Sequence, residues 1–391
     1  MSDETYLPYA KQSLSTEDID AVQQALNSPV ITRGPLVEAF EKAVAEYCGA
    51  KYAVAFNSGT AALMAAYFAA DVGQHDTVIT TPNTFVATVG AAMERQATPL
   101  FIDIDRKTGN INIEQLILNL NRPNSKGKNV VVPVHFAGIP VDMEAIDAAI
   151  TDYRTVVIED AAHALGSNYK DGSKVGSCLW SQMTVFSFHP AKNITTGEGG
   201  MVTTNDEELF RLLKLYRNNG IERDPAFLHN EARPGYYEVM TLSGNYNFTE
   251  MQAALGLSQM KRLDAFVERR KELVALYREK LSCIPTVKLL EPEESLNVAY
   301  HLFVVQIDFE AHRTDKKKVM DALHEKGIGT QVHYIPVYHH PFFMTQAGDI
   351  SEYFPENEAY YHQALSLPLY YDMRNHDVER VVKALKNALR L

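Results

Sequence analysis

Lys192 lies in a segment that would suit a reactive amine. The segment reads FSFHPAKNITTGEGG over residues 186–200, with β-rich residues before the lysine and a glycine-rich turn after it. Such a lysine is either a solvated side chain on a surface hairpin or an amine that holds a group covalently. In the second case the amine would form a Schiff base with a carbonyl carbon.

Ser58, Gly59 and Thr60 form a candidate phosphate site between a strand-like run and a helix-like run. Free backbone amides and the positive end of a helix dipole would face outward there, and the hydroxyl groups would add donors. The same residues would also serve as a simple helix N-cap, which is the commoner role of serine or threonine at a helix start.

Asp160 ends the apolar run VVIED. Taken alone it would most simply cap the following helix, but a buried carboxylate at a strand end needs a partner. A phosphate cradle, a buried carboxylate and an accessible lysine together predict pyridoxal 5′-phosphate as the cofactor. Lys192 would form the Schiff base, Asp160 would keep the pyridine nitrogen protonated, and residues 58–60 would bind the phosphate.

The elements that must position these residues alternate along the chain. Helices are expected at 15–26, with a Ser15–Asp18 capping box, at 34–49 and at 59–70. Strand-like runs are expected at 52–56, 77–82, 98–104, 129–136, 155–161 and 183–188, and a further run follows at 201–204. This alternation predicts an α/β protein with a mainly parallel sheet covered on both faces, which binds ligands at the carboxyl ends of its strands.

The pattern of short alternating strand-like and helix-like runs changes near Thr249. One long helix is expected over 249–281, followed by a strand at 301–308 and a helix at 316–327. We predict a large cofactor-binding domain over residues 1–250, with an N-terminal arm, and a smaller C-terminal α+β domain over residues 251–391.

Composition narrows the class of protein. The chain has 391 residues, 46% of them hydrophobic and 22% charged, and a net charge of −12. The acidic balance argues against nucleic acid or an anionic membrane surface as a partner. Three cysteines without CxxC spacing, a polar N-terminus and no long apolar run predict a soluble cytoplasmic protein without a disulfide framework.

Five segments resemble, in order, the motifs of the DegT/DnrJ/EryC1/StrS aminotransferase family. They are FNSGTAAL, TPNTFVAT, IEDAAHALGS, SFHPAKNITTGEGGMVTTND and GNYNFTEMQAALGLSQMKRL. The resemblance runs from about Pro8 to the C-terminus. It implies the fold-type I architecture of pyridoxal-phosphate aminotransferases and activity on nucleotide-linked keto sugars. The segments HALGSNYKDGSKVGS and LHEKGIGTQVHYIPVYHHPFF, with LSLPLYYDM near the end, resemble family members of pseudaminic acid biosynthesis.

The resemblance also implies residue roles. Lys192 matches the Schiff-base lysine and Asp160 the partner of the pyridine nitrogen. Gly59, Thr60 and Ser187 match the phosphate ligands, Phe85 the aromatic that stacks on the cofactor ring, His163 a residue close to the ring, and Asn245 an asparagine that reaches the phosphate from the neighbouring subunit. His163 would also be explained as a satisfied interior histidine. The match of Asn245 implies a homodimer with composite active sites.

Asn247 departs from the family pattern, because an arginine usually follows the tyrosine of this motif. Arginine is a natural bidentate partner of carboxylates and phosphates. Its absence leaves open which residue binds the carboxylate of the amino donor. Arg217 and Arg33 are candidates, although either would also be explained as a surface or interface charge.

Two further groups of residues allow more than one interpretation. His333, His339 and His340 lie in a proline-containing segment without a third-ligand carboxylate at helical spacing, so we predict no metal site. We expect His333 and Tyr334 to line the pocket for the sugar nucleotide instead. Cys178 would suit a desulfurase only if it were activated, and a buried structural thiol is the simpler reading.

The resemblance implies transfer of an amino group from L-glutamate to C4 of a UDP-linked 4-keto-6-deoxy-N-acetylhexosamine. The product would be the 4-amino sugar nucleotide used for pseudaminic acid. Three alternatives remain open: an aminotransferase for another keto sugar of the bacillosamine, legionaminic acid or perosamine type, a sugar dehydratase and a non-enzymatic regulator. Lys192 disfavours the dehydratase, because that sister group carries histidine at this position.

Overall fold

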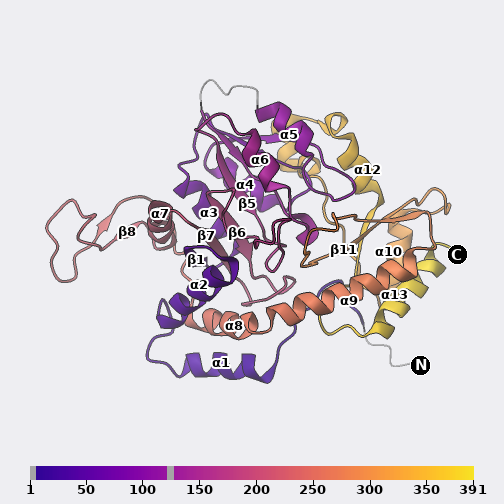
Figure 1. Cartoon of the computed structure of the whole chain (residues 1–391), viewed down its shortest axis with the longest axis horizontal. Helices are drawn as coiled ribbons and strands as arrows, with labels where there is room; N and C mark the ends of the chain where they lie inside the picture. Colours follow the sequence, from indigo (N-terminus) through magenta and orange to yellow (C-terminus); the bar gives the residue numbers. More distant parts are fainter. Residues whose placement is uncertain (1–5, 121–126) are drawn as a thin grey trace.

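A seven-stranded sheet forms the centre of the molecule (Figure 1). The computed structural model describes residues 6–120 and 127–391. Across the sheet the strands are β1 (Tyr52–Phe56), β7 (Gly200–Thr204), β6 (Met183–Ser187), β5 (Val156–Asp160), β4 (Asn129–Val131), β2 (Thr77–Thr80) and β3 (Thr98–Phe101). Six of these strands run in the same direction, and β7 runs opposite to them between β1 and β6. The predicted mainly parallel sheet is therefore confirmed.

Helices cover both faces of this sheet, as its apolar strands require. One face packs against α2 (Pro35–Cys48), α5 (Ile113–Leu120), α6 (Met143–Ala149) and α8 (Glu250–Met260). The other face packs against α3 (Gly59–Ala69), α4 (Val86–Glu94) and α7 (Glu207–Arg217). Side chains alternate along β1, so that Ala53 and Ala55 enter the first layer while Val54 and Phe56 enter the second.

The expected single helix over 249–281 is wrong at its centre. The chain forms α8 and then α9 (Leu263–Leu281), with a turn at Lys261 and Arg262. The guanidinium of Arg262 lies 2.5 Å from the carboxylate of Asp18, a buried residue of α1 (Thr16–Leu26). This tertiary contact holds the chain at the turn, and a helical sequence pattern carries no information about it.

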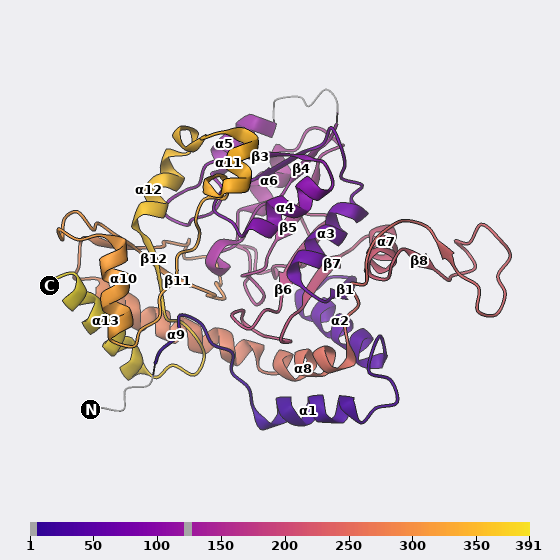
Figure 2. The ribbon, with the colours of Figure 1, turned by 180° about the vertical axis from the view of Figure 1, so that it is seen from behind.

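A second, antiparallel sheet lies beyond α9 and consists of β10 (Val287–Leu289), β11 (Phe303–Ile307) and β12 (Ala364–Leu367). It packs against α9, α10 (Lys316–Glu325) and α13 (Asn375–Ala388) in a separate apolar cluster. Figure 2 shows these helices together on one side of the molecule. The short helices α11 (Pro341–Ala347) and α12 (Pro355–Gln363) follow the loop that carries His333 and Tyr334. A boundary at residue 250 stays a prediction.

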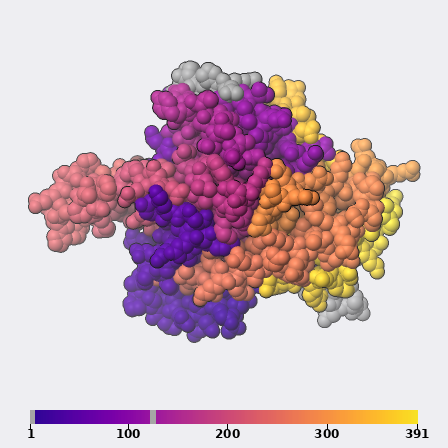
Figure 3. Space-filling view, viewed as in Figure 1, coloured from indigo at the N-terminus to yellow at the C-terminus, as the bar shows by residue number. Residues whose placement is uncertain are grey.

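A hairpin of β8 (Ile221–Glu222) and β9 (Glu238–Val239) projects from the body of the molecule, as the space-filling view shows (Figure 3). The capping box of α1 is confirmed. The apolar residues Ile19 and Leu26 of this helix are not buried in the chain's own core, since they are 61% and 55% exposed.

Within residues 6–120 and 127–391, no helix is both long and apolar enough to cross a bilayer.

Glu250 ties α8 to the start of α2. Its carboxylate, 1% exposed, accepts hydrogen bonds of 3.0, 3.1 and 3.0 Å from the amides of Gly34, Leu36 and Val37. An anion at this end of a helix is favoured by both the free amides and the helix dipole.

The variant Glu250→Gln should lower the free energy of unfolding by about 1–3 kcal/mol, because its amide nitrogen cannot accept and leaves a buried N–H unpaired. Urea unfolding followed by circular dichroism measures this loss. Glu268→Gln on the exposed side of α9 is the matched control. Equal stability of the Glu250 variant and this control would contradict the assigned role of Glu250.

Candidate active site

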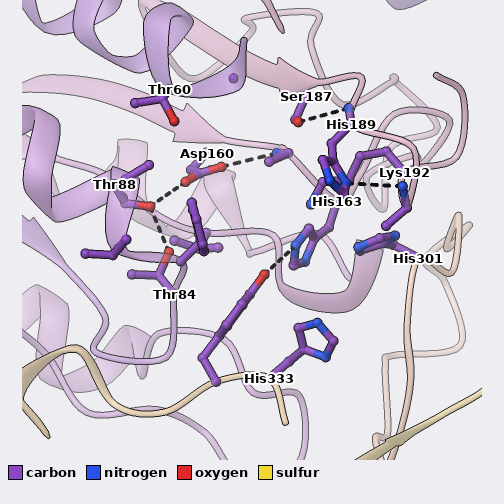
Figure 4. Close-up of a pocket in the computed structure, with 18 of the residues that line it drawn as sticks. Thr60, Thr84, Thr88, Asp160, His163, Ser187, His189, Lys192, His301 and His333 are labelled. Carbon is purple, nitrogen blue, oxygen red and sulfur yellow. Dashed lines mark hydrogen bonds between the residues drawn. The ribbon is translucent and has the colours of Figure 1, made fainter. Parts of the chain in front are cut away.

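A pocket of about 650 Å³ opens at the carboxyl ends of the parallel strands (Figure 4). Its walls come from the segments that follow β1, β2, β5 and β6, together with the loops that carry His301 and residues 331–335. Most of the residues predicted for the cofactor therefore line one cavity, namely Ser58, Gly59, Thr60, Phe85, Asp160, His163, Ser187 and Lys192. Phe85 is still 58% exposed.

Lys192 follows β6 and is held in a tight loop by a hydrogen bond of 2.8 Å from its amide to the carbonyl of His189. Its amine has no hydrogen-bond partner among the described residues. Burial lowers the pKa of this amine from 10.5 to about 8, against an opposing effect of the Asp160 charge. Roughly a tenth of the amine would therefore be uncharged at pH 7, far more than for an exposed lysine, and only the uncharged form is a nucleophile.

Asp160 presents a buried carboxylate at the end of β5. One oxygen accepts a hydrogen bond of 2.7 Å from the hydroxyl of Thr88, and the other accepts one of 3.2 Å from the amide of Ala162. The hydroxyl of Thr88 also lies 2.8 Å from that of Thr84, one helical turn away. These contacts fix the carboxylate in a site that a cationic ring nitrogen would fit.

The start of α3 is the place where a phosphate cradle is predicted. The hydroxyl of Ser58 caps the helix by accepting a hydrogen bond of 3.1 Å from the amide of Ala61. Gly59 faces β6 so closely that a Cβ atom there would lie 3.0 Å from the Cβ of Ser187. The hydroxyl of Thr60 and the first amides of the helix remain as donors. This donor set, beside a lysine and a buried carboxylate, fits pyridoxal phosphate.

His163 is both an interior histidine and a lining residue of the pocket. Its Nδ1 accepts a hydrogen bond of 3.2 Å from the amide of Ala137, so its proton resides on Nε2. Nε2 then donates to the hydroxyl of Tyr334 at 2.9 Å, a bond drawn from His163 in Figure 4. Burial and the nearby charge of Lys192 hold the pKa of His163 well below 6.5, which agrees with a neutral ring.

Of the three histidines predicted as a group, His333 and His340 line the pocket and His339 does not. His333 and Tyr334 line the pocket, and Nδ1 of His333 lies 2.8 Å from the hydroxyl of Ser366. Nε2 of His339 instead lies 2.7 Å from the carboxylate of Glu358, and His339 does not line the pocket. His340 is among the residues that line the pocket. In the described part of the chain, no three His, Cys, Asp or Glu side chains are grouped to hold a metal ion.

Three predicted residues lie outside the pocket of their own chain. The guanidinium of Arg217 is held by the carboxylate of Glu41 at 2.5 Å, so Arg217 is not available to a donor carboxylate there. Arg33 is exposed, before α2. The side-chain oxygen of Asn245 accepts a hydrogen bond of 2.7 Å from the side chain of Asn247. The anchor of the donor carboxylate therefore stays open.

Sequence reasoning missed Thr88, which supports Asp160, and His301, whose buried ring lines the pocket. Thr88 had a signal, because it lies one helical turn after Thr84 in the segment TPNTFVAT. A polar residue at the start of the apolar run of β11 was the corresponding signal for His301. Cys178 is buried, and burial raises the pKa of its thiol to about 11, as expected of a structural cysteine.

Comparison with known proteins decides the family. The model of the DegT/DnrJ/EryC1/StrS aminotransferase family matches residues 12–386. The chain belongs to this family. The spore coat polysaccharide biosynthesis protein SpsC of Bacillus subtilis is 39% identical over 386 residues, which cover 98% of this chain and 97% of SpsC.

Two solved structures have the same fold as this chain over nearly its whole length. PseC of Helicobacter pylori, an aminotransferase of pseudaminic acid biosynthesis, matches with a TM-score of 0.89 and 31% identity, over 99% of this chain and 100% of PseC. DesV of S. venezuelae, solved with a ketimine intermediate, matches with a TM-score of 0.86 and 27% identity, over 99% of this chain and 100% of DesV.

These findings confirm the predicted family, the fold-type I architecture and the enzyme class. The chain is a sugar aminotransferase that uses pyridoxal 5′-phosphate. When bound, the cofactor supplies an aldehyde that reacts with amines and a ring that takes up the electrons of a broken C–H bond. The residues of the pocket would bind its phosphate, orient its ring and exclude water.

The variant Thr88→Val should weaken binding of pyridoxal phosphate about tenfold or more, because the carboxylate of Asp160 loses a buried hydrogen bond to a charged group. Equilibrium dialysis followed by absorption of the bound cofactor measures the dissociation constant. The control is Thr345→Val, at an exposed position of α11. An unchanged constant in the Thr88 variant would show that Asp160 needs no support from this hydroxyl.

Proposed function

We propose that this enzyme transfers the amino group of L-glutamate to C4 of UDP-2-acetamido-2,6-dideoxy-β-L-arabino-hexos-4-ulose. The product is UDP-4-amino-4,6-dideoxy-N-acetyl-β-L-altrosamine, an intermediate of pseudaminic acid. The observation that carries the amino-transfer chemistry is the shared cavity of Lys192, Asp160 and the α3 cradle. The likeness to PseC over the whole chain supports the choice of sugar.

Each residue of the pocket takes a role in this proposal. Lys192 holds the cofactor and moves a proton between the Cα atom of the donor and the cofactor, which its lowered pKa of about 8 permits. Asp160 keeps the ring nitrogen protonated. Ser58, Gly59, Thr60 and Ser187 bind the phosphate, Phe85 stacks on the ring, His163 lies at its edge, and His333 and Tyr334 contact the sugar nucleotide.

The active enzyme is proposed to be a homodimer in which Asn245 of the second subunit completes the phosphate site. Exposed apolar side chains support this arrangement. They include Ile19 and Leu26 of α1 and Leu242, next to the projecting hairpin, which is 92% exposed. The described residues that line the pocket include one lysine and no arginine. Cations for the diphosphate of the substrate would then come from the second subunit, where Arg33 is a candidate.

A different keto sugar is the second candidate. SpsC acts in spore coat polysaccharide biosynthesis and is more similar in sequence, at 39% identity, than PseC at 31%. A keto sugar of the bacillosamine, legionaminic acid or perosamine type would use the same residues around the cofactor. A regulator without activity is less well supported, because the chain keeps both Lys192 and Asp160 in one pocket.

The variant Lys192→Ala should abolish amino transfer while the protein stays folded, because Lys192 supplies the one side-chain amine among the described residues that line the pocket. Turnover of a UDP-4-keto sugar with glutamate, followed by mass spectrometry of the product, measures the loss. Lys317→Ala at an exposed position of α10 is the control and should keep full turnover. Turnover by the Lys192 variant at the rate of the control would refute the mechanism.

A panel of 4-keto sugars linked to UDP or GDP tests the proposed substrate. The β-L-arabino sugar should be aminated fastest, and proton couplings of the product should show the L-altro configuration at C4. Faster amination of a D-configured sugar, or of a GDP-linked sugar, would reject this substrate and favour the second candidate. No amination of any sugar, with glutamate consumed, would reject the class of acceptor.

A further inference from the structure

We propose that His301 is a positioning residue for Lys192: its imidazole accepts a hydrogen bond from the free amine and directs the lone pair of that amine into the pocket. The inference rests on the proposed function, because it concerns the stage at which Lys192 is free and moves a proton. It assigns a role to a residue that the sequence alone did not single out.

The backbone around His301 is fixed to the loop of Lys192. The side chain of Asn193, next to Lys192, donates hydrogen bonds of 3.0 Å to the carbonyl of Leu165 and 3.2 Å to that of Ala299. Two residues after Ala299, the amide of His301 donates a bond of 3.0 Å to the carbonyl of Ala137. The two loops are therefore joined directly, which holds His301 beside the amine-bearing loop.

Arg270 also holds the segment that contains His301 in place. Its guanidinium is buried and donates to the carbonyls of His301 at 3.3 Å and Leu369 at 2.9 Å. No carboxylate is among its hydrogen-bond partners in the described part of the chain. Arg270 therefore fixes the backbone of the segment that contains His301. Burying its charge without a carboxylate partner costs free energy, which indicates that a fixed position of this segment is important.

The imidazole of His301 has hydrogen-bonding capacity that the described residues do not use. Its ring lines the pocket and is 3% exposed, and its Nδ1 is fully enclosed without a partner. Such a group costs free energy and calls for an explanation in bound water, ligand or catalysis. Figure 4 shows His301 beside Lys192, whose amine also has no partner in the described residues.

The neighbouring histidines His163 and His333 each have at least one ring nitrogen in a hydrogen bond. Both ring nitrogens of His163 are engaged, one by the amide of Ala137 and one by Tyr334, and the ring centroid of His163 lies 4.3 Å from that of His301. Nδ1 of His333 contacts Ser366. Among these three histidines, His301 is the one with a fully enclosed ring nitrogen that has no partner in the described residues.

A neutral imidazole suits this task better than a carboxylate would. Burial, and then the charge of Lys192, hold the pKa of His301 well below 6.5, so the ring is neutral and can accept. A carboxylate in its place would pair with the ammonium form and raise the pKa of the amine. A neutral acceptor orients the amine and still leaves it partly uncharged near pH 8, where it can take a proton.

The first experiment measures the ionisation of Lys192 without turnover. The holoenzyme is converted to its amine form with glutamate, freed of 2-oxoglutarate and treated with acetic anhydride over a pH series. Acetylation of the Lys192 peptide is then quantified by mass spectrometry. His301→Phe should lower the titration midpoint by about one unit, because a hydrogen bond to the ammonium form is lost. His301→Gln, which keeps an acceptor, should stay within a few tenths of the wild type.

The second experiment tests whether His301 acts through Lys192. His301→Phe should slow the half-reaction with glutamate about tenfold or more, and His301→Gln should restore most of the rate. In the Lys192→Ala background, rescued with methylamine, His301→Phe should have no further effect, because residues that act as a unit are not additive. His312→Phe, a histidine bonded to Thr286 away from the pocket, is the control and should match the wild type throughout.

The outcomes separate this inference from the proposed function. An unchanged midpoint in His301→Phe, or an additive loss in the Lys192→Ala background, would overturn the role of His301 while wild-type amination still stands. A rise in KM for glutamate with an unchanged midpoint would make His301 a substrate contact and also overturn it. Failure of wild-type amination would instead reject the proposed function. Melting temperatures of all variants guard against loss of folding.

Discussion

The buried carboxylate of Asp160 is the feature on which the rest of the pocket depends. In the proposed function this buried carboxylate faces a cationic ring nitrogen, so its own surroundings have to supply the remaining hydrogen bonds. Thr88 and the amide of Ala162 do so from α4 and from the turn after β5. In that function the position of the ring nitrogen would fix where the aldehyde carbon and the phosphate can lie. Lys192 and the start of α3 line the same cavity, as this arrangement requires.

A buried hydrogen-bond network on the opposite face of β5 helps to hold the backbone of Asp160 in place. Because side chains alternate along a strand, Glu159 points away from Asp160, into a buried network with His135 at 2.7 Å and Thr184 at 2.9 Å. Nδ1 of His135 accepts from the amide of Val141, so its Nε2 carries the proton that bonds Glu159. Burial raises the pKa of Glu159, yet the bonds from His135 and its neighbours outweigh burial and lower it. The amide of His135 also donates to the carbonyl of Asp160 at 3.0 Å, which couples the network to the site.

The parts of the fold that follow from local pattern could be predicted, and those that depend on distant contacts could not. Parallel strands, the capping box of α1 and the residues at the strand ends all have signals within a few neighbouring positions. The break between α8 and α9 depends on the contact of Arg262 with Asp18, far away in the sequence. Arg217 could not be excluded from the pocket before Glu41 was seen to hold it. His301 is set beside Lys192 by a backbone link through Asn193, which no spacing along the chain reveals.

The balance of charge in the pocket explains why histidines gather around the amine. A reactive lysine needs a dry site, which lowers its pKa, but it also needs partners that fix its direction. A carboxylate partner would reverse the effect of burial, while a second cation in contact with the amine could offer only hydrogen-bond donors. Neutral imidazoles avoid both problems, since burial keeps the rings of His163 and His301 uncharged. In the proposed function Asp160 serves the cofactor ring, and its carboxylate oxygens accept hydrogen bonds from the hydroxyl of Thr88 and the amide of Ala162, although its charge still opposes the effect of burial on Lys192. The separation of these two tasks, a charged partner for the ring and neutral partners for the lysine, is what lets one cavity hold both a stable cation and a free base.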